Sequence, residues 1–298
     1  MPDENIHFMP NDDLLSFDEL FRLISIFCKK GLKKVRFTGG EPFLRKGFID
    51  FLKQVNFAFP HLKVHITTNG SLLHLFLDEL KKRVVHGINI SLDTLDSEKF
   101  KQITQRGSLS NVLSAIHSLS KTVIPIKVNM VVQQNSNADD ILSMIDYFKE
   151  TNIHLRFIEF MPFNERSNHA LIWSGEKILS HIKHYYPSIV SVPSKRNATS
   201  LNYKLSSSSD FQFGIIEGFS RTFCGSCNRM RLTANGDFKT CLYADPVFNL
   251  KQMLRDNVSE DSIRLAIEHA ISHRFKNGLE AQEARNNAQF LSMSKIGG

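Results

Sequence analysis

Short segments in which apolar and polar residues alternate recur along the chain, separated by segments of helical periodicity. The expected strands cover residues 34–38, 62–68, 87–92, 125–132 and 154–160. The expected helices begin with a capping box at Ser16 and cover residues 16–30, 46–58, 71–83, 97–121 and 138–150. This arrangement is typical of βα units on a parallel sheet. It is compatible with two α/β folds, a doubly wound sheet and a partial barrel.

Side-chain alternation within the strands distinguishes between these two folds. Each of four successive strands has an apolar face and a polar face, and the polar faces carry Arg36, Thr38, His65, Thr67, Asn69, Asn89, Ser91, Asp93, Lys127 and Asn129. A doubly wound sheet would be apolar on both faces, because helices cover both. A closed barrel would have a lumen of Val, Ile and Leu. A partial barrel with a polar lumen explains the pattern better.

A polar lumen must hold a polar ligand, because buried charges need partners. The alternative is an internal hydrogen-bond network. We consider it less favourable, because Arg36 and Lys127 are cations with few acidic residues on the same strands. The last of these strands adds Arg156 and ends in Glu159 and Met161. The lumen is therefore predicted to be a binding site.

The second half of the chain contains a cluster of cysteines. Cys224, Cys227 and Cys241 fall within eighteen residues, whereas Cys28 lies in an apolar helical stripe and is expected in the core. A strand at 211–217 is expected to lead into this cluster. Further helices are expected at 175–185, 248–256 and 260–273, while 163–174 is expected to be an irregular loop and 276–290 is weakly patterned.

The dipeptide Asn235-Gly236 predicts a hairpin that brings Cys241 back toward the other two cysteines. A two-residue loop would place Cys241 beside Met230, and a three-residue loop would place it beside Arg229. Spacing alone leaves three states open: an iron-sulfur cluster with one free coordination site, a zinc site that lacks its fourth ligand, or unligated thiols. Arg229 and Arg231 indicate that an anion could occupy the open position.

The net charge of +7 and the pI of about 9.2 fit an anionic ligand. The basic residues form no block, and the chain carries no named nucleic-acid motif, so a nucleic-acid partner is not expected. Four cysteines in 298 residues do not make a disulfide framework, which favours a reducing compartment. No apolar run reaches the roughly eighteen residues of a membrane span, and the beginning of the sequence is not a signal peptide.

Several motifs together resemble one known family. They are Arg36-Phe-Thr-Gly-Gly-Glu-Pro42, Thr67-Thr-Asn-Gly70, Ser91-Leu-Asp93, Arg156-Phe-Ile-Glu-Phe-Met161, Cys224-x2-Cys227-Asn-Arg-x-Arg231 with Cys241, and the terminal Gly297-Gly298. With these residues the chain resembles, from Met1 to Gly298, the GTP 3',8-cyclases of molybdenum-cofactor biosynthesis, which are radical S-adenosylmethionine (SAM) enzymes. The glycine-rich turn is shared by many radical SAM enzymes, whereas the cysteine motif and the Gly-Gly tail are highly specific.

The resemblance implies a partial, TIM-like βα barrel of the radical SAM type over residues 1–162. A C-terminal region, 163–298, would carry the cysteine hairpin and a Gly-Gly tail that enters the active site. It assigns Arg156 to catalysis. SAM would contact Gly40, Ser91 and Met161, whereas GTP would contact Arg36, Thr67, Lys127, Arg229 and Arg231. A 4Fe-4S cluster would be held by Cys224, Cys227 and Cys241.

The family also implies that GTP is converted by SAM-derived radical chemistry to the cyclic molybdopterin precursor. It further implies an electron donor, a downstream enzyme that processes the product, a homodimer and, in a bacterium, a cytoplasmic location. The family's Cys-x3-Cys-x2-Cys, which binds the SAM-cleaving cluster, is not found, and Met1-Pro2 resembles the dipeptide that follows its third cysteine. We therefore expect a fragment or a misplaced start, and no reaction by the chain as written.

Two alternatives come from other functional classes. One is a non-catalytic nucleotide-binding protein with a single iron-sulfur cluster, and the other is a zinc-stabilised scaffold. Both would retain the cysteine hairpin, so metal content and product formation separate them from the cyclase.

Overall fold

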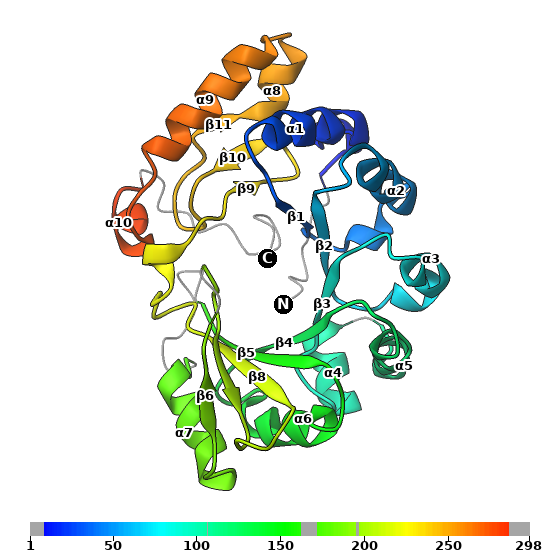
Figure 1. Ribbon diagram of the computed structural model, residues 1–298, viewed down its shortest axis with the longest axis vertical. Helices are drawn as coiled ribbons and strands as arrows, with labels where there is room; N and C mark the ends of the chain where they lie inside the picture. The colour runs from blue at the N-terminus through cyan, green and yellow to red at the C-terminus, as the bar shows by residue number, and fades with distance from the viewer. Residues whose placement is uncertain (1–8, 106, 162–171, 195–196, 286–298) are drawn as a thin grey trace.

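An open, curved sheet of eight strands forms the centre of the protein, shown by a computed structural model that describes residues 9–105, 107–161, 172–194 and 197–285 (Figure 1). The strand order is β1-β2-β3-β4-β5-β8-β7-β6. These strands are β1 (Lys34–Phe37), β2 (Lys63–Thr68), β3 (Gly87–Ser91), β4 (Ile126–Val132), β5 (His154–Glu159), β6 (Val190–Val192), β7 (Leu201–Lys204) and β8 (Gln212–Ile216). The pairs from β1 to β5 and on to β8 are parallel, and β7 and β6 continue antiparallel.

Helices cover the outer face of this sheet (Figure 1). They are α1 (Phe17–Lys29), α2 (Phe48–Ala58), α3 (Leu77–Lys81), α4 (Ser97–Thr104), α5 (Leu109–Ser120), α6 (Ile141–Phe148) and α7 (Gly175–Tyr185). The predicted alternation of helices and strands is confirmed. The prediction of one helix over 97–121 is wrong, because Gln105 adopts the left-handed conformation at φ 56° and ends α4.

Alternate residues supply the core in β2 and β4, whereas β3, β5 and β8 bury consecutive residues. In β4 every second residue is buried, starting with Ile126, and the residues between them are half-buried. β2 follows the same alternation, with Val64 and Ile66 fully buried. In β2 and β4 the apolar face is buried and the polar face is half-buried, as expected for a partial barrel; in a doubly wound sheet helices would bury both faces. The parallel α/β fold is thus confirmed, and the open, curved sheet is consistent with the partial barrel.

A smaller unit follows β8. Up to residue 285 it contains a three-stranded antiparallel sheet in the order β11-β10-β9 and the helices α8 to α10. Its elements are β9 (Arg231–Leu232), β10 (Asp237–Lys239), β11 (Phe248–Asn249), α8 (Leu250–Arg255), α9 (Glu260–Ser272) and α10 (Gly278–Glu283). The short helix α10 was not predicted. The sheet itself crosses the boundary expected at residue 162, because β6, β7 and β8 all belong to it.

Helix α1 joins the two units. Ile24 belongs to the core beneath the large sheet, whereas Leu23 and Ile26 belong to a second core with α8, α9 and Phe238 of β10. Cys28 packs on the first core, as predicted. One helix therefore contributes apolar surface to both cores, which fixes the smaller unit against the side of the barrel.

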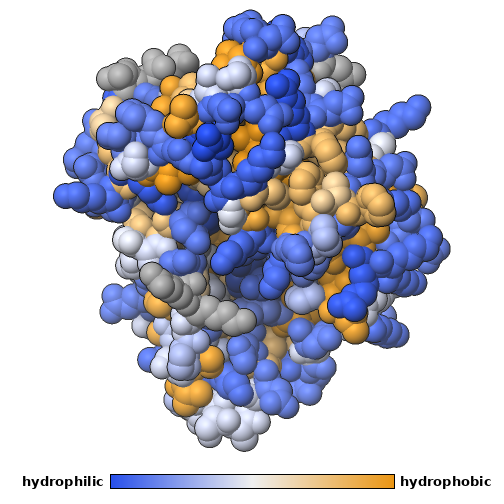
Figure 2. Space-filling view, turned by 45° about the horizontal axis from the view of Figure 1, so that its top comes forward, coloured by the Kyte–Doolittle hydropathy of each residue, from blue (hydrophilic) through white to orange (hydrophobic). Residues whose placement is uncertain are grey.

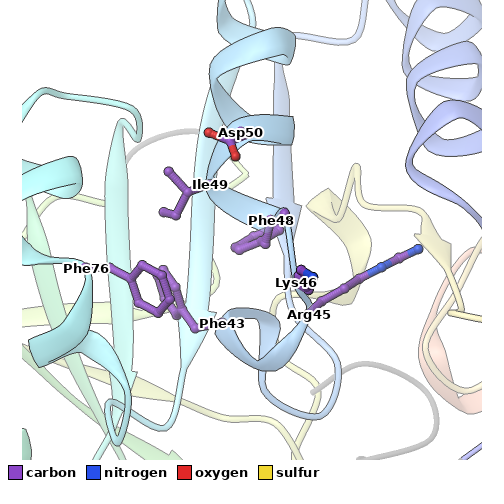
Figure 3. Close-up of a pocket in the computed structure, with 8 residues that line it drawn as sticks. Phe43, Arg45, Lys46, Phe48, Ile49, Asp50 and Phe76 are labelled. Carbon is purple, nitrogen blue, oxygen red and sulfur yellow. The ribbon is translucent and has the colours of Figure 1, made fainter.

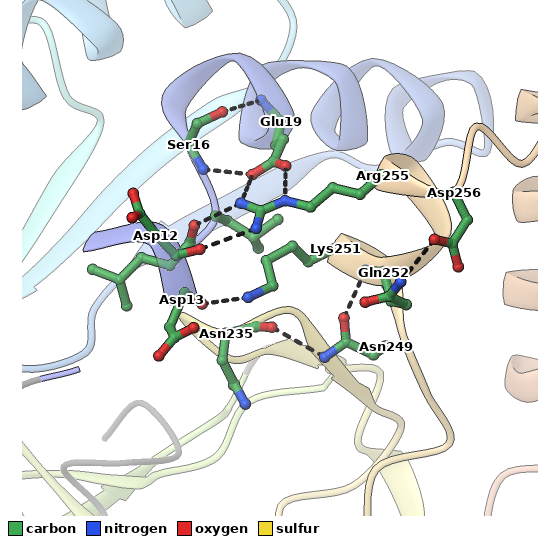
Figure 4. Close-up of polar contacts among 12 residues, drawn as sticks. Asp12, Asp13, Ser16, Glu19, Asn235, Asn249, Lys251, Gln252, Arg255 and Asp256 are labelled. Carbon is green, nitrogen blue, oxygen red and sulfur yellow. Dashed lines mark hydrogen bonds and ion pairs between the residues drawn. The ribbon is translucent and has the colours of Figure 1, made fainter. Parts of the chain in front are cut away.

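Polar contacts reinforce this junction (Figure 4). The capping box predicted at Ser16 is present, and its Glu19 carboxylate also accepts a hydrogen bond of 2.7 Å from Arg255 Nε on α8. Arg255 donates a further bond of 3.0 Å to the Asp12 carbonyl, and Lys251 Nζ donates to the Asp13 carbonyl at 2.6 Å. The segment before α1 is thereby held to α8.

No helix within the described ranges combines the length and the apolar character needed to cross a membrane.

Candidate active site

Polar residues form rows across the face of the sheet that is turned away from the helices. One row pairs Arg36 of β1 with His65 of β2. A second row runs from β2 to β5 and contains, in order, Thr67, Asn89, Lys127 and His154. A further row contains Ser91, Asn129, Arg156 and Gly214. The predicted polar face therefore exists as one continuous surface. Figure 2 shows a hollow near the middle of one face of the molecule, bordered by hydrophilic surface.

Arg36 is central to this surface. Its Nη1 donates to the Ile66 carbonyl at 3.1 Å and to Thr67 Oγ1 at 3.3 Å. Burial, and in second place the positive charge of Arg229, lower the pKa of Arg36 to about 10. Three residues predicted to bind GTP, from β1, β2 and the cysteine segment, are thus brought to one place.

Arg156 is 8% exposed, and its Nε donates to Asn129 Oδ1 at 2.9 Å. Burial and the charge of Arg36 lower the pKa of Arg156 to about 10. In the part of the chain that the structure describes, the charges that perturb Arg36 and Arg156 are therefore cationic. A buried cluster of like charges is unfavourable without counter-charge, so this surface favours an anion.

The positive charges extend to the neighbouring strands. Burial first, then Arg36 and Arg229, lower the pKa of Lys34. Lys127 is close enough to His65 and His154 to lower the pKa of both. We call the set of Lys34, Arg36, Lys127, Arg156 and Arg229 the lumen cations.

The glycine-rich turn after β1 is fixed by a carboxylate. Glu41 accepts hydrogen bonds from Thr68 Oγ1 at 2.8 Å, from Asn69 N at 2.9 Å and from Phe43 N at 3.2 Å. Burial raises the pKa of Glu41 despite these bonds. A Cβ atom added at Gly40 would meet no atom within 4 Å. The turn is therefore rigid, and its backbone at Gly40 is open to close approach.

The three residues assigned to SAM all follow or end a parallel strand. Gly40 lies beyond β1, Ser91 is the last residue of β3, and Met161 lies beyond β5. The carboxyl ends of parallel strands meet at one edge of a sheet, where barrels of this type carry their active sites. Met161 also contacts the cysteine segment, since Tyr243 Oη lies 3.2 Å from its Sδ.

The hairpin register can now be assigned. Lys239 pairs with Arg231, and Phe238 pairs with Leu232. Continuing this register places Cys241 opposite Arg229, so the three-residue loop is confirmed and the two-residue loop is wrong. Gly236 adopts φ 94°, and Thr233 Oγ1 accepts from the Asp237 amide, which closes the wider loop.

Cys224 and Cys227 lie on a single 3-10 turn, where Cys227 N donates to the Cys224 carbonyl at 3.1 Å. Arg229 Nε lies 3.4 Å from Cys227 Sγ. Burial raises the pKa of the Cys227 thiol, but the hydrogen bonds and charge of Arg229 outweigh burial, and the pKa is lowered. Arg231 is near Cys227 and Cys241, and Tyr243 is near Cys224 and Cys241, so the three thiols border one region.

Three thiols are the donor set of a 4Fe-4S cluster with one open iron, and they are one ligand short of a structural zinc site. Within the described residues, no three His, Cys, Asp or Glu side chains are grouped closely enough to hold one ion. A tetrahedral zinc site needs all its sulfurs about 2.3 Å from one centre. In a 4Fe-4S cluster each cysteine binds a different iron.

Sequence reasoning did not single out Lys239 and gave no role to Glu159, two buried charged residues near the cysteine segment. Lys239 is 4% exposed and donates to the Leu242 carbonyl at 3.2 Å; burial, then Arg285 and Arg231, lower its pKa. Glu159 is 1% exposed, and its oxygens accept bonds from Gly175, Phe219 and Ser220. The sequence signal for Lys239 was its position in the short segment that leads to Cys241. The signal for Glu159 was its place in the motif that ends in Met161.

A pocket between α2 and the turn before it lies apart from this site (Figure 3). Its walls include the stacked rings of Phe43 and Phe76, together with Phe48 and Ile49. None of the residues predicted to bind SAM, GTP or a metal lines it. The Gly297-Gly298 tail and residues 163–171 of the expected loop lie outside the described residues.

Two protein families match the chain. The Radical SAM superfamily matches residues 3–148, and Molybdenum Cofactor Synthesis C matches residues 153–279. Among solved structures, Streptococcus suis SuiB bound to S-adenosylmethionine has a TM-score of 0.58 at 16% identity and covers 88% of this chain and 62% of that chain. A structure of anSMEcpe with bound AdoMet and a peptide has a TM-score of 0.56 at 13% identity, covering 95% and 85%. At these identities the likeness supports the fold alone.

Curated relatives extend over nearly the whole chain. The Caenorhabditis elegans molybdenum cofactor biosynthesis protein moc-5 is 34% identical over 296 residues, which cover 96% of this chain and 49% of the relative. The chain thus spans about half the length of such relatives. The GTP 3',8-cyclase of Aliarcobacter butzleri is 32% identical over 298 residues, covering 100% of this chain and 91% of the relative. The Listeria monocytogenes GTP 3',8-cyclase is 33% identical, with the same coverage. The chain therefore belongs to the GTP 3',8-cyclase family of radical SAM proteins.

Proposed function

We propose that the complete protein is a GTP 3',8-cyclase that forms the cyclic molybdopterin precursor from GTP. The lumen cations are the observation that supports this most directly. Five basic side chains from β1, β4, β5 and the cysteine segment converge on one polar surface, and the charges that perturb Arg36 and Arg156 are all positive. A triphosphate supplies the counter-charge that such a surface needs. The curated bacterial relatives carry the same activity in their names.

Each predicted substrate residue has a role in this proposal. Arg36 and Lys127 would neutralise phosphate oxygens, and Thr67 would add a hydroxyl. Arg156, which Asn129 holds in place, would contact the substrate near the SAM edge of the sheet and stabilise negative charge there. Arg229 and Arg231 would hold the nucleotide beside the cysteine hairpin.

The cofactors would be held by separate residues. Cys224, Cys227 and Cys241 would hold a 4Fe-4S cluster, and SAM would lie against Gly40, Ser91 and Met161. Bound SAM supplies radical chemistry once reduced, and a three-cysteine cluster supplies an open coordination site for substrate. The proposal further includes a second cluster for SAM cleavage, an electron donor, a downstream enzyme, a homodimer and, in a bacterium, a cytoplasmic location.

Nucleotide binding tests the role of the lumen cations. With Lys127→Gln the affinity for GTP should fall about tenfold or more, because one charge-assisted hydrogen bond contributes about 1.5–3 kcal/mol. Lys121→Gln removes an exposed lysine at the end of α5 and should leave affinity unchanged. Calorimetry with GTP, GDP, GMP and guanosine should give affinities that fall with each phosphate removed. Equal affinities across the series would contradict a phosphate site in the lumen.

Metal content and product formation separate the alternatives. Anaerobically reconstituted protein should hold about four irons with the hairpin cluster alone and about eight with two clusters, whereas a scaffold would hold zinc. Incubation with GTP, SAM and a reductant should yield 5'-deoxyadenosine and the cyclic nucleotide, detected by chromatography and mass spectrometry. Protein that binds GTP and about four irons without forming product would favour the non-catalytic nucleotide-binding alternative.

A further inference from the structure

Two histidines lie among the lumen cations and have no role so far. His65 on β2 stands in the row of Arg36, and His154, the first residue of β5, stands next to Lys127 in its row. Both are two residues nearer the amino ends of their strands than the nearest predicted substrate residue, Thr67 or Arg156. They therefore lie deeper in the lumen than the edge that carries the SAM residues.

Each histidine ring occupies space left by a strand glycine. A Cβ atom at Gly87 would lie 2.7 Å from His65 Nδ1, and a Cβ atom at Gly214 would lie 3.2 Å from His154 Nε2. At Gly87 a real Cβ atom could not come this close to the ring, and at Gly214 the contact would be tighter than a normal van der Waals contact. Neither glycine has a positive φ angle, so close approach of the ring, rather than backbone conformation, is what these positions accommodate.

The surroundings of both rings are basic. His65 faces Lys34 and Arg36 from β1, His86 from the loop before β3, and Lys127 from β4. These charges, after burial, lower the pKa of His65 to about 3.

His154 faces Lys127 from β4 and Asn202 from β7, and it shares β5 with Arg156. Burial and the two cations lower its pKa to about 4. A hydrogen bond between the ring and the Asn202 side chain opposes this shift but does not outweigh it. Both rings are thus neutral at physiological pH in the nucleotide-free fold.

We propose that His65 and His154 form the floor of the phosphate subsite and take up protons when the triphosphate of a nucleotide enters the lumen. This inference rests on the proposed function. The ribose must approach the SAM edge at the carboxyl ends of the strands, so the phosphates extend toward the amino ends, where the two rings lie. Without nucleotide the lumen cations repel a protonated histidine ring, whereas a bound triphosphate attracts it. Each ring then gains a proton from solvent and donates an N–H to a phosphate oxygen.

Proton uptake can be measured directly. Calorimetric titration of GTP at pH 6.5 in buffers of different ionisation enthalpy gives the protons bound per complex. The chain should take up more protons than His65→Asn/His154→Asn. His117→Asn, which removes an exposed histidine on α5, should behave as the unaltered chain. Protons bound or released by the nucleotide itself are the same for every protein, so they cancel when the proton uptake of two proteins is subtracted. Equal proton uptake by all three proteins overturns the inference.

Affinity should follow the same dependence on pH. The double variant should bind GTP about tenfold more weakly than the unaltered chain at pH 6, and the deficit should shrink toward pH 8.5, because one linked proton changes affinity up to about tenfold per pH unit. Guanosine, which has no phosphate, should show no such dependence. A deficit that is the same at both pH values overturns the inference.

A measurement on the unaltered chain covers the case in which the variants do not fold. Nitrogen-15 shifts of the histidine rings at pH 6.5 should report two neutral imidazoles that become imidazolium on addition of GTP. Rings that stay neutral in the GTP complex overturn the inference but leave the cyclase proposal standing. Absence of GTP binding would instead overturn the cyclase proposal itself.

Discussion

Glu159 illustrates at the scale of one residue how a motif position can be structural. Its Oε1 accepts from Gly175 N at 2.7 Å and Ser220 Oγ at 2.8 Å, and its Oε2 accepts from Phe219 N and Ser220 N at 2.9 and 2.8 Å. These donors belong to the start of α7 and to the loop that precedes the cysteines. One buried carboxylate therefore links the end of β5 to the cysteine segment.

Replacing Glu159 should be costly. In Glu159→Gln an NH2 group replaces one carboxylate oxygen and would face N–H donors, with which it cannot form hydrogen bonds. The free energy of unfolding should therefore fall by about 2–4 kcal/mol. Glu150→Gln, at an exposed position after α6, should change it by less than about 0.5 kcal/mol. Urea denaturation followed by circular dichroism measures both. Similar small changes for the two variants would contradict the anchoring role.

The histidines of the lumen predict a pH dependence of stability. An unfolded histidine binds a proton below about pH 6.5, whereas the pKa values of His65 and His154 in the nucleotide-free fold are about 3 and about 4. Protons bind the unfolded chain preferentially between these values, so stability falls as pH is lowered from about 6.5 toward 4. Thermal unfolding without nucleotide should show this decline. It should be weaker in His65→Asn/His154→Asn, and an identical decline in the variant would contradict the assignment.

At the scale of elements, the junction of α1 with α8 and α9 can show whether apolar packing or surface ion pairs hold the smaller unit to the barrel. Ile267 of α9 is fully buried in the second core, whereas the Arg255 side chain is 43% exposed. Ile267→Ala should lower the free energy of unfolding by about 2–5 kcal/mol. Arg255→Ala should lower it by less than about 1 kcal/mol despite its several hydrogen bonds. Urea denaturation of both variants checks the ranking, and a larger effect of Arg255→Ala would show that the polar junction dominates.

The order of helices and parallel strands was predictable because side-chain period and burial on one face are local properties. The polar face with Arg36, Thr67 and Lys127 followed from the same periodicity. The break between α4 and α5 was not predicted, although residues 104–108 carry no apolar side chain and Gly107 is a signal for the end of a helix. The β6–β7 hairpin depends on pairing with β8, and the short α10 shows too little periodicity to be recognised.

The cysteine region marks a different limit. The sequence identified the three thiols and left two hairpin registers open, since the choice depends on how β10 pairs with both β9 and β11. The burial of Lys239 beside Cys241 depends on tertiary packing, which periodicity does not report. The roles of the metal and SAM residues remain predictions carried by the family motifs.

At the scale of the whole molecule, the positive charge is divided between two environments. Lysines on the outer helices are largely matched by neighbouring carboxylates, as in the pairs Lys53–Glu79, Lys99–Asp140 and Lys149–Asp146. The lumen cations instead lie close to one another. The lumen cations thus form one group of neighbouring positive charges.

This division predicts selective competition. Inorganic triphosphate should displace GTP from the lumen, because it satisfies the same charges. Double-stranded DNA should not displace GTP at physiological salt, because the matched outer surface offers weak phosphate binding and the helix is too wide for the lumen. Fluorescence competition with a labelled GTP analogue measures both. Effective competition by DNA would indicate an exposed basic surface and contradict the confinement of charge to the lumen.

The sharing of α1 between two cores has a consequence for how the protein is made. Lys29 at the end of α1 contacts Glu260, which is 231 residues further along the chain. During synthesis the face of α1 that carries Leu23 and Ile26 remains uncovered until α8 and α9 have left the ribosome. Contacts this distant form late, and exposed apolar faces invite wrong partners. The nascent chain thus carries an uncovered apolar stripe on α1 until α8 and α9 have been made.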